Sequence, residues 1–122
     1  RRCRRGDHHV CAKLVEVGIS LGRAGAMAER LAVPASTLHT LPETVDDELG
    51  ALVEPGGNAV RAVRAAALSP GERLLVAGAG PIGLLAALFA RADGVEVHLV
   101  GRSDRSIAFA RHCSGDMYAY LP

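Results

Sequence analysis

Six residues in the middle of the chain form a glycine pattern that suits phosphate binding. The segment Gly78-Ala79-Gly80-Pro81-Ile82-Gly83 fits G-x-G-x-x-G and joins a predicted strand to a predicted helix. In this pattern the first glycine permits a tight turn, the second lets a pyrophosphate approach, and the third lets helix and strand pack closely. N–H groups at the helix start then face the anion. An ordinary strand-to-helix turn is the alternative, but the flanking elements favour a dinucleotide site formed by Gly78, Gly80, Pro81, Ile82 and Gly83.

A second group of polar residues follows the next predicted strand. Gly101, Arg102 and Ser103 come directly after Val100, where many dinucleotide folds carry an acid that binds the ribose 2′-hydroxyl. Without that carboxylate nothing repels a 2′-phosphate, for which Arg102 offers a fork of donors and Ser103 a hydroxyl. We therefore predict that these three residues bind the cofactor and favour NADP, with NAD as the second option. The alternative is a solvated Arg102 and an unselective site.

A parallel sheet must position these residues. We expect strands at 73–77, 95–100 and 117–121, alternating with helices at 81–92 and 103–113. Strands separated by helices pair in parallel. The sequence thus predicts an α/β fold containing the first half of a Rossmann sheet.

The upstream half of the sequence has a different pattern of apolar residues. Short apolar runs broken by glycines and Pro34 indicate strands and turns of a β-rich layer over 14–41. A capping box of Thr44 and Asp47 is expected to start a short helix at about 45–53. A second helix is expected at about 57–68.

Composition excludes several classes of function. Fourteen basic and 13 acidic side chains give a net charge of +1, so we expect no nucleic-acid partner and no membrane partner. An apolar content of 49% excludes disorder. Three cysteines and the lack of a secretory signal pattern favour a cytoplasmic location.

Several motifs stand in a characteristic order along the whole chain. They are Cys3 to Cys11, Gly25-Ala26-Met27-Ala28-Glu29, Val33-Pro34, Leu41-Pro42, Ala51-Leu52-Val53-Glu54-Pro55, and Gly78 to Gly83. This set resembles the zinc-dependent medium-chain alcohol dehydrogenase family, in particular its polyol, glucose and threonine dehydrogenase-like branch. The resemblance implies an internal fragment, in which residues 1–68 are the β-rich end of a GroES-like catalytic domain with its linking helices. Residues 69–122 would be the first half of the Rossmann domain.

The resemblance also implies two places for metal. Cys3 and Cys11 match the third and fourth thiolates of the family's structural zinc lobe, whose first two would precede Arg1. Two thiolates cannot close a tetrahedral site, so a truncated lobe is expected, with two unrelated thiols as the alternative. Glu54 matches a glutamate at or near the catalytic zinc, and the alternative is a solvated carboxylate. The chain departs from the family at Gly56-Gly57-Asn58, where aliphatic residues are usual.

The activity that the resemblance implies is hydride transfer between NADP(H) and a small-molecule secondary alcohol, polyol or ketone, with zinc polarising the substrate oxygen. A homo-oligomer of the intact protein is left open. The 122-residue chain alone is predicted to be inactive, because the nicotinamide half of the Rossmann fold would be missing. Two alternatives are the FAD-binding segment of a flavin-dependent monooxygenase, which opens like residues 74–102, and a non-catalytic nucleotide-binding remnant.

Overall fold

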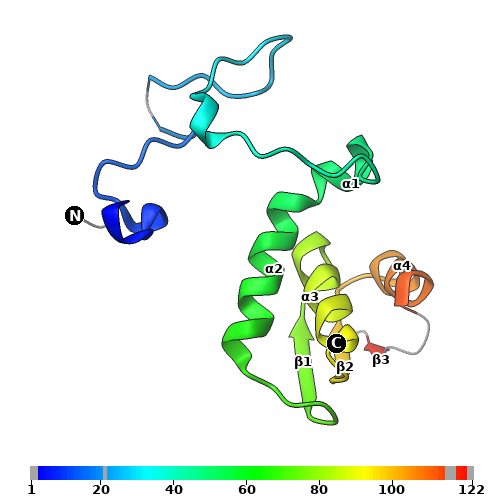
Figure 1. The fold of residues 1–122 in the computed structure, drawn as a ribbon. Coiled ribbons are helices and arrows are strands. Elements are labelled where there is room, and N and C mark those ends of the chain that lie inside the picture. Colours follow the sequence, from blue (N-terminus) through cyan, green and yellow to red (C-terminus); the bar gives the residue numbers. More distant parts are fainter. Residues whose placement is uncertain (1–2, 21, 115–117, 121–122) are drawn as a thin grey trace. The chain divides into compact units, whose positions relative to one another are not determined.

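The computed structural model of the chain describes residues 3–20, 22–114 and 118–120 (Figure 1). The chain divides into two compact units, residues 1–40 and residues 41–122. No helix among the described residues has both the length and the apolar character needed to cross a membrane.

The first unit is built of turns and short 3-10 helices. The strands expected within residues 14–41 do not form in the described part of that segment, which lacks only Leu21. A strand is held by hydrogen bonds to a neighbouring strand, and the described residues of this unit offer no such neighbour. Apolar side chains of these runs stay exposed, among them Ile19 and Met27. The 3-10 helices are η1 (Cys3–Arg5), η2 (His8–Val10) and η3 (Ala35–Thr37).

Two helices open the second unit, α1 (Asp47–Ala51) and α2 (Val53–Ala66). The N-cap of α1 is Asp46 and not Thr44, because the Asp46 carboxylate accepts the N–H of Leu49 at 2.8 Å. Helix α2 begins at Val53, earlier than the expected start at about 57, and includes Pro55. Proline is tolerated there because the first turn of a helix makes no hydrogen bond through its N–H groups.

The remaining residues form a parallel sheet with helical connections, which confirms the predicted α/β fold. The strands stand in the order β1-β2-β3 and all pair in parallel. Ala77 is in register with Val100, and Val100 with Tyr120, so the carboxyl ends of the strands share one edge of the sheet. The bounds are β1 (Arg73–Ala77), α3 (Pro81–Ala92), β2 (Glu96–Val100), α4 (Asp104–Ser114) and β3 (Tyr118–Tyr120).

One face of the sheet is packed against helices. Val97, Leu99 and Ala119 point to this side and are almost completely buried. The helices meet them largely through alanines, such as Ala87 of α3 and Ala110 of α4, which are fully buried. Small side chains let the helix backbones come close to the sheet, so this core needs few large residues.

The opposite face of the sheet is open in the described part of the unit. Leu75 is 66% exposed there, and Tyr118 and Tyr120 are about half exposed. His98 lies on the same face, with its Nε2 2.7 Å from the Glu96 Oε1 and its ring stacked on that of Tyr118 at 4.7 Å between centroids. His98 is therefore a satisfied structural residue of the sheet.

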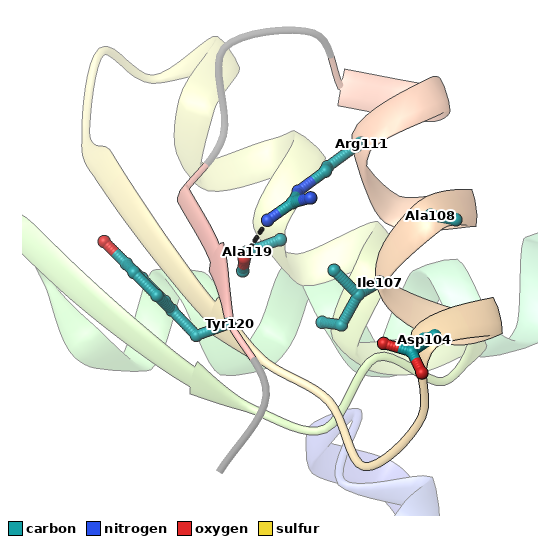
Figure 2. Close-up of a pocket in the computed structure, with 6 residues that line it drawn as sticks. All are labelled: Asp104, Ile107, Ala108, Arg111, Ala119 and Tyr120. Carbon is teal, nitrogen blue, oxygen red and sulfur yellow. Dashed lines mark hydrogen bonds between the residues drawn. The ribbon is translucent and has the colours of Figure 1, made fainter.

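An arginine ties α4 to the last strand. The Arg111 Nη2 donates a hydrogen bond to the Ala119 carbonyl oxygen at 2.9 Å, across a hollow of about 420 Å³ (Figure 2). In Figure 2 the Tyr120 side chain leaves β3 on the side away from α4, as strand alternation requires. The short strand β3 is thus held by β2 on one side and by Arg111 above.

The two faces of the sheet predict different responses to the same substitution. Leu99→Ala should lower the free energy of unfolding by about 2–5 kcal/mol, because it leaves a cavity in the core. Leu75→Ala, on the neighbouring strand but exposed, is the matched control and should cost about 0.5 kcal/mol or less. Chemical denaturation measures both, and equal losses would contradict this description of the core.

Candidate dinucleotide-binding site

The glycine-rich turn leaves the sheet at its carboxyl edge, between β1 and α3. Gly78 has φ +122°, a backbone conformation that favours glycine. Its N–H donates to the Val100 carbonyl oxygen at 2.8 Å, so the turn begins directly from the hydrogen-bonded ladder with β2. The turn is therefore anchored to both strands that flank the site.

Gly83 brings α3 against the start of the turn. A Cβ atom at this position would fall on the carbonyl oxygen of Gly78 and would lie 3.4 Å from the Val76 Cγ1. The third glycine therefore has the close-packing role that the motif predicts, because any side chain here would push the helix away from β1.

Gly80 stands in open space at the N-cap of α3. A Cβ atom on Gly80 would have no atom within 4 Å, and its carbonyl oxygen accepts the N–H of Leu84 at 2.9 Å. The N–H groups of Ile82 and Gly83 lie in the first turn after Pro81, where a helix has no carbonyl one turn earlier. These donors and the helix dipole favour an anion over Gly80, so the turn fits a pyrophosphate.

The end of β2 lies against this turn. Gly101 is buried, and a Cβ atom there would lie 3.0 Å from the Ala79 Cβ, 2.9 Å from the Ser106 Oγ and 2.9 Å from the Ile107 Cδ1. The tertiary structure thus brings the glycine-rich turn and the start of α4 together at Gly101. The sequence did not single out Ala79, Ser106 or Ile107, since no spacing rule connects them.

Arg102 and Ser103 follow at the same edge. Arg102 is exposed, and its guanidinium has no hydrogen bond or ion pair with the described residues. The Ser103 Oγ caps α4 by accepting the N–H of Ser106 at 3.3 Å. A hollow of about 410 Å³ beside them is lined by Ser103, Arg105, Ser106 and Phe109. The edge therefore presents hydroxyls and cations but, at residues 101–103, no carboxylate.

An apolar groove of about 420 Å³ borders the turn on its other side. Its lining is almost entirely hydrocarbon, contributed by the turn and by three helices or their ends. No periodicity in the sequence predicted it, because the side chains come from segments far apart in the chain. They are Leu52, Ala79, Pro81, Leu84, Leu85, Leu88, Phe109 and Cys113.

The candidate metal ligands do not come together in the described part of the chain. Glu54 is exposed, and its Oε1 accepts a hydrogen bond from the Asn58 Nδ2 at 2.8 Å. Cys11 is half-buried, and the side chain of Cys3 lies outside the described residues. Among the described residues no three His, Cys, Asp or Glu side chains form a group that could hold a metal. These donors do not by themselves fit a zinc ion, which takes four ligands in structural sites.

Sequence comparison finds dehydrogenases. No family model matches the chain. The L-threonine 3-dehydrogenase of Idiomarina loihiensis is 46% identical over 100 residues, which are 82% of this chain and 28% of that protein. The chain therefore spans less than a third of the length of this curated relative.

Solved structures agree in fold. An Escherichia coli alcohol dehydrogenase in complex with NADH superposes with a TM-score of 0.85 and 28% identity, over 99% of this chain and 36% of that one. A Sinorhizobium meliloti protein named as a putative zinc-binding dehydrogenase, bound to NADP, superposes with a TM-score of 0.82 and 29% identity, over 98% of this chain and 34% of that one. The fold expected for this chain is the end of a GroES-like domain followed by the first half of a Rossmann sheet. The chain shares this fold with these dehydrogenases.

Two glycines of the turn predict opposite outcomes in a stability measurement. Gly83→Ala should cost at least about 2 kcal/mol of unfolding free energy, because its Cβ would displace the Gly78 carbonyl. Gly80→Ala, three residues earlier in open space, should stay within about 0.5 kcal/mol of the wild type. A Gly83→Ala variant as stable as Gly80→Ala would contradict the close approach of α3 and β1.

The ordered motifs, the parallel sheet and the glycine-rich turn agree with both comparisons. The resemblance drawn from the sequence is therefore confirmed: over most of its length the chain is similar to dehydrogenases of the medium-chain alcohol dehydrogenase family.

Proposed function

We propose that this chain is part of a zinc-dependent dehydrogenase that transfers hydride between NADP(H) and a secondary alcohol, polyol or ketone. One observation carries the proposal. The open Gly80 turn lies next to a strand end that carries Gly101, Arg102 and Ser103 in place of a carboxylate.

The geometry supports a specific placement of the cofactor. The pyrophosphate would lie over Gly80 and accept the first-turn N–H groups of α3. The adenosine ribose would then lie toward the end of β2, where Arg102 and Ser103 would hold a 2′-phosphate. The neighbours bound to NADP and to NADH support a nicotinamide cofactor, while the preference for NADP rests on these residues.

The named relatives support the substrate class. The hydroxyl that an L-threonine 3-dehydrogenase oxidises is a secondary alcohol on a small molecule. The same chemistry is proposed for the protein that contains this chain. The described residues contribute the cofactor side of that reaction.

Zinc binding is proposed for the whole protein. When bound, it would polarise the substrate oxygen. The family assignment supports Glu54 at or near that ion, and Cys3 and Cys11 in a structural lobe, although the described donors alone do not complete either site. We assign no catalytic step to this chain through the metal.

The proposed domain division is residues 1–68 and 69–122. Helix α2 packs along α3, and residues 41–122 form one compact unit. The linking helices α1 and α2 thus belong to the same compact unit as the Rossmann half. The division stays a prediction for the intact protein.

Cofactor preference gives the direct test of this function. We expect the intact protein to bind NADPH more tightly than NADH. Arg102→Ala should weaken NADPH binding about tenfold, because it removes a charge-assisted contact to the 2′-phosphate, and should change NADH binding less than about twofold. Isothermal titration calorimetry measures both dissociation constants.

Arg61→Ala is the matched control for Arg102→Ala. Arg61 is also exposed but lies on α2, so its loss should leave both constants unchanged. Tighter binding of NADH than of NADPH by the wild type would refute the NADP assignment.

Turnover gives a second test. The intact protein should lose dehydrogenase activity on zinc chelation and regain it when zinc is restored, whereas the 122-residue chain should show no turnover. The isolated chain is expected to be inactive because hydride transfer needs the nicotinamide and the substrate held together. Spectrophotometric assays follow the absorbance of the reduced nicotinamide. Full activity after chelation, or turnover by the 122-residue chain, would contradict the proposal.

A further inference from the structure

We propose that Ser106 is a positioning residue for cofactor selectivity, which holds Ser103 in place and keeps a side chain out of position 101. The inference rests on the proposed binding of NADP at this edge and adds a residue that no motif includes. Ser106 does not touch the cofactor in this proposal. It acts through its two neighbours.

The hydroxyl of Ser106 is fixed by Ser103. The Ser106 Oγ donates to the Ser103 carbonyl oxygen at 2.8 Å, and the Ser103 Oγ donates to the Ser106 Oγ at 3.1 Å. The Ser106 N–H donates in turn to the Ser103 Oγ at 3.3 Å. The Ser106 N–H and the bond to the Ser103 carbonyl hold the first turn of α4 and with it the Ser103 Oγ. To bind a 2′-phosphate, the Ser103 O–H would turn from the Ser106 Oγ to the phosphate, because a hydroxyl has a single donor.

The Ser106 hydroxyl is one of three groups that close the space above Gly101, with the Ile107 Cδ1 at 2.9 Å and the Ala79 Cβ at 3.0 Å from the position of a Cβ atom there. A Cβ atom on Gly101 would lie 2.9 Å from the Ser106 Oγ, closer than nonbonded atoms normally pack. The Ser106 Oγ could rotate away only by giving up its bond to the Ser103 carbonyl. The Ala79 Cβ, at 3.0 Å, is attached to the backbone of the turn and has no rotamer to change.

Selectivity in this arrangement has a steric part as well as an electrostatic one. A carboxylate at position 101 would bind the ribose 2′-hydroxyl and repel a 2′-phosphate. It could enter only if Ser106 released Ser103, and that movement would loosen the hydroxyl proposed to hold the phosphate. A carboxylate introduced at position 101 would therefore also weaken the contact of Ser103 with the phosphate. Ser106 couples these two effects.

A double-mutant cycle on the intact protein tests this coupling. The variants are Gly101→Asp, Ser106→Ala and the pair, with Gly101→Ala as a milder variant that adds only the Cβ atom. The melting temperature is measured without cofactor, and dissociation constants are measured for NADPH and NADH. Thr37→Ala is the matched control, because Thr37 also donates its hydroxyl to a carbonyl three residues earlier, that of Pro34 at 2.7 Å.

We expect Ser106→Ala to lower the NADPH preference about fivefold or more, Ser106→Thr to restore it, and Thr37→Ala to leave it unchanged. Gly101→Asp and Gly101→Ala should each lower the melting temperature. Adding Ser106→Ala should recover part of that loss, a non-additive result expected of residues in contact. The double variant Gly101→Asp with Ser106→Ala should bind NADH more tightly than NADPH.

An unchanged preference in Ser106→Ala, or additive effects on the melting temperature, would overturn the proposal. Failure of the proposed function looks different, since a wild type that prefers NADH refutes the NADP assignment itself. The melting temperatures, measured without cofactor, then still decide whether Ser106 keeps a side chain out of position 101.

Discussion

The approach of α3 to the end of β1 is the constraint on which the candidate site depends. It is possible because Gly83 has no side chain to meet the Gly78 carbonyl. With the helix this close, its first turn points at the carboxyl edge of the sheet, where its N–H groups can serve an anion. The buried alanines of α3 and α4 extend the same principle, since they bring both helices onto the sheet at short range.

A second close approach, at Gly101, brings the chemistry of two separate segments to one place. The glycine-rich turn contributes Ala79 and the start of α4 contributes Ser106 and Ile107, all around one buried glycine. The positions proposed for the pyrophosphate and the 2′-phosphate are then neighbours at one edge. Packing and electrostatics support the same cofactor, because the crowding that removes a side chain from position 101 also removes the carboxylate that would repel the phosphate.

The metal candidates behave differently from the glycines. A phosphate site can be built from backbone N–H groups within one short segment, whereas a zinc site needs several side chains to converge. Glu54 is satisfied locally by Asn58, at the very departure from the family that the sequence shows at Gly56-Gly57-Asn58. The chain spans 28% of the L-threonine 3-dehydrogenase it matches. Its described residues supply the cofactor side of the proposed reaction, and zinc remains a proposal for the whole protein.

The sequence by itself determined the order of strands and helices after residue 72, because strand and helix patterns and a glycine turn are local signals. It also determined the family and the identity of the turn's glycines. Only the tertiary structure decided the rest. The strands expected in 14–41 do not form, since a strand depends on a partner that its own sequence does not specify. Helix α2 begins at Val53 and includes Pro55, ahead of the expected start at about 57, because proline is tolerated in the first turn of a helix. The crowding of Ala79, Ser106 and Ile107 around Gly101 arises only when β2, α4 and the turn pack together, which no residue spacing encodes.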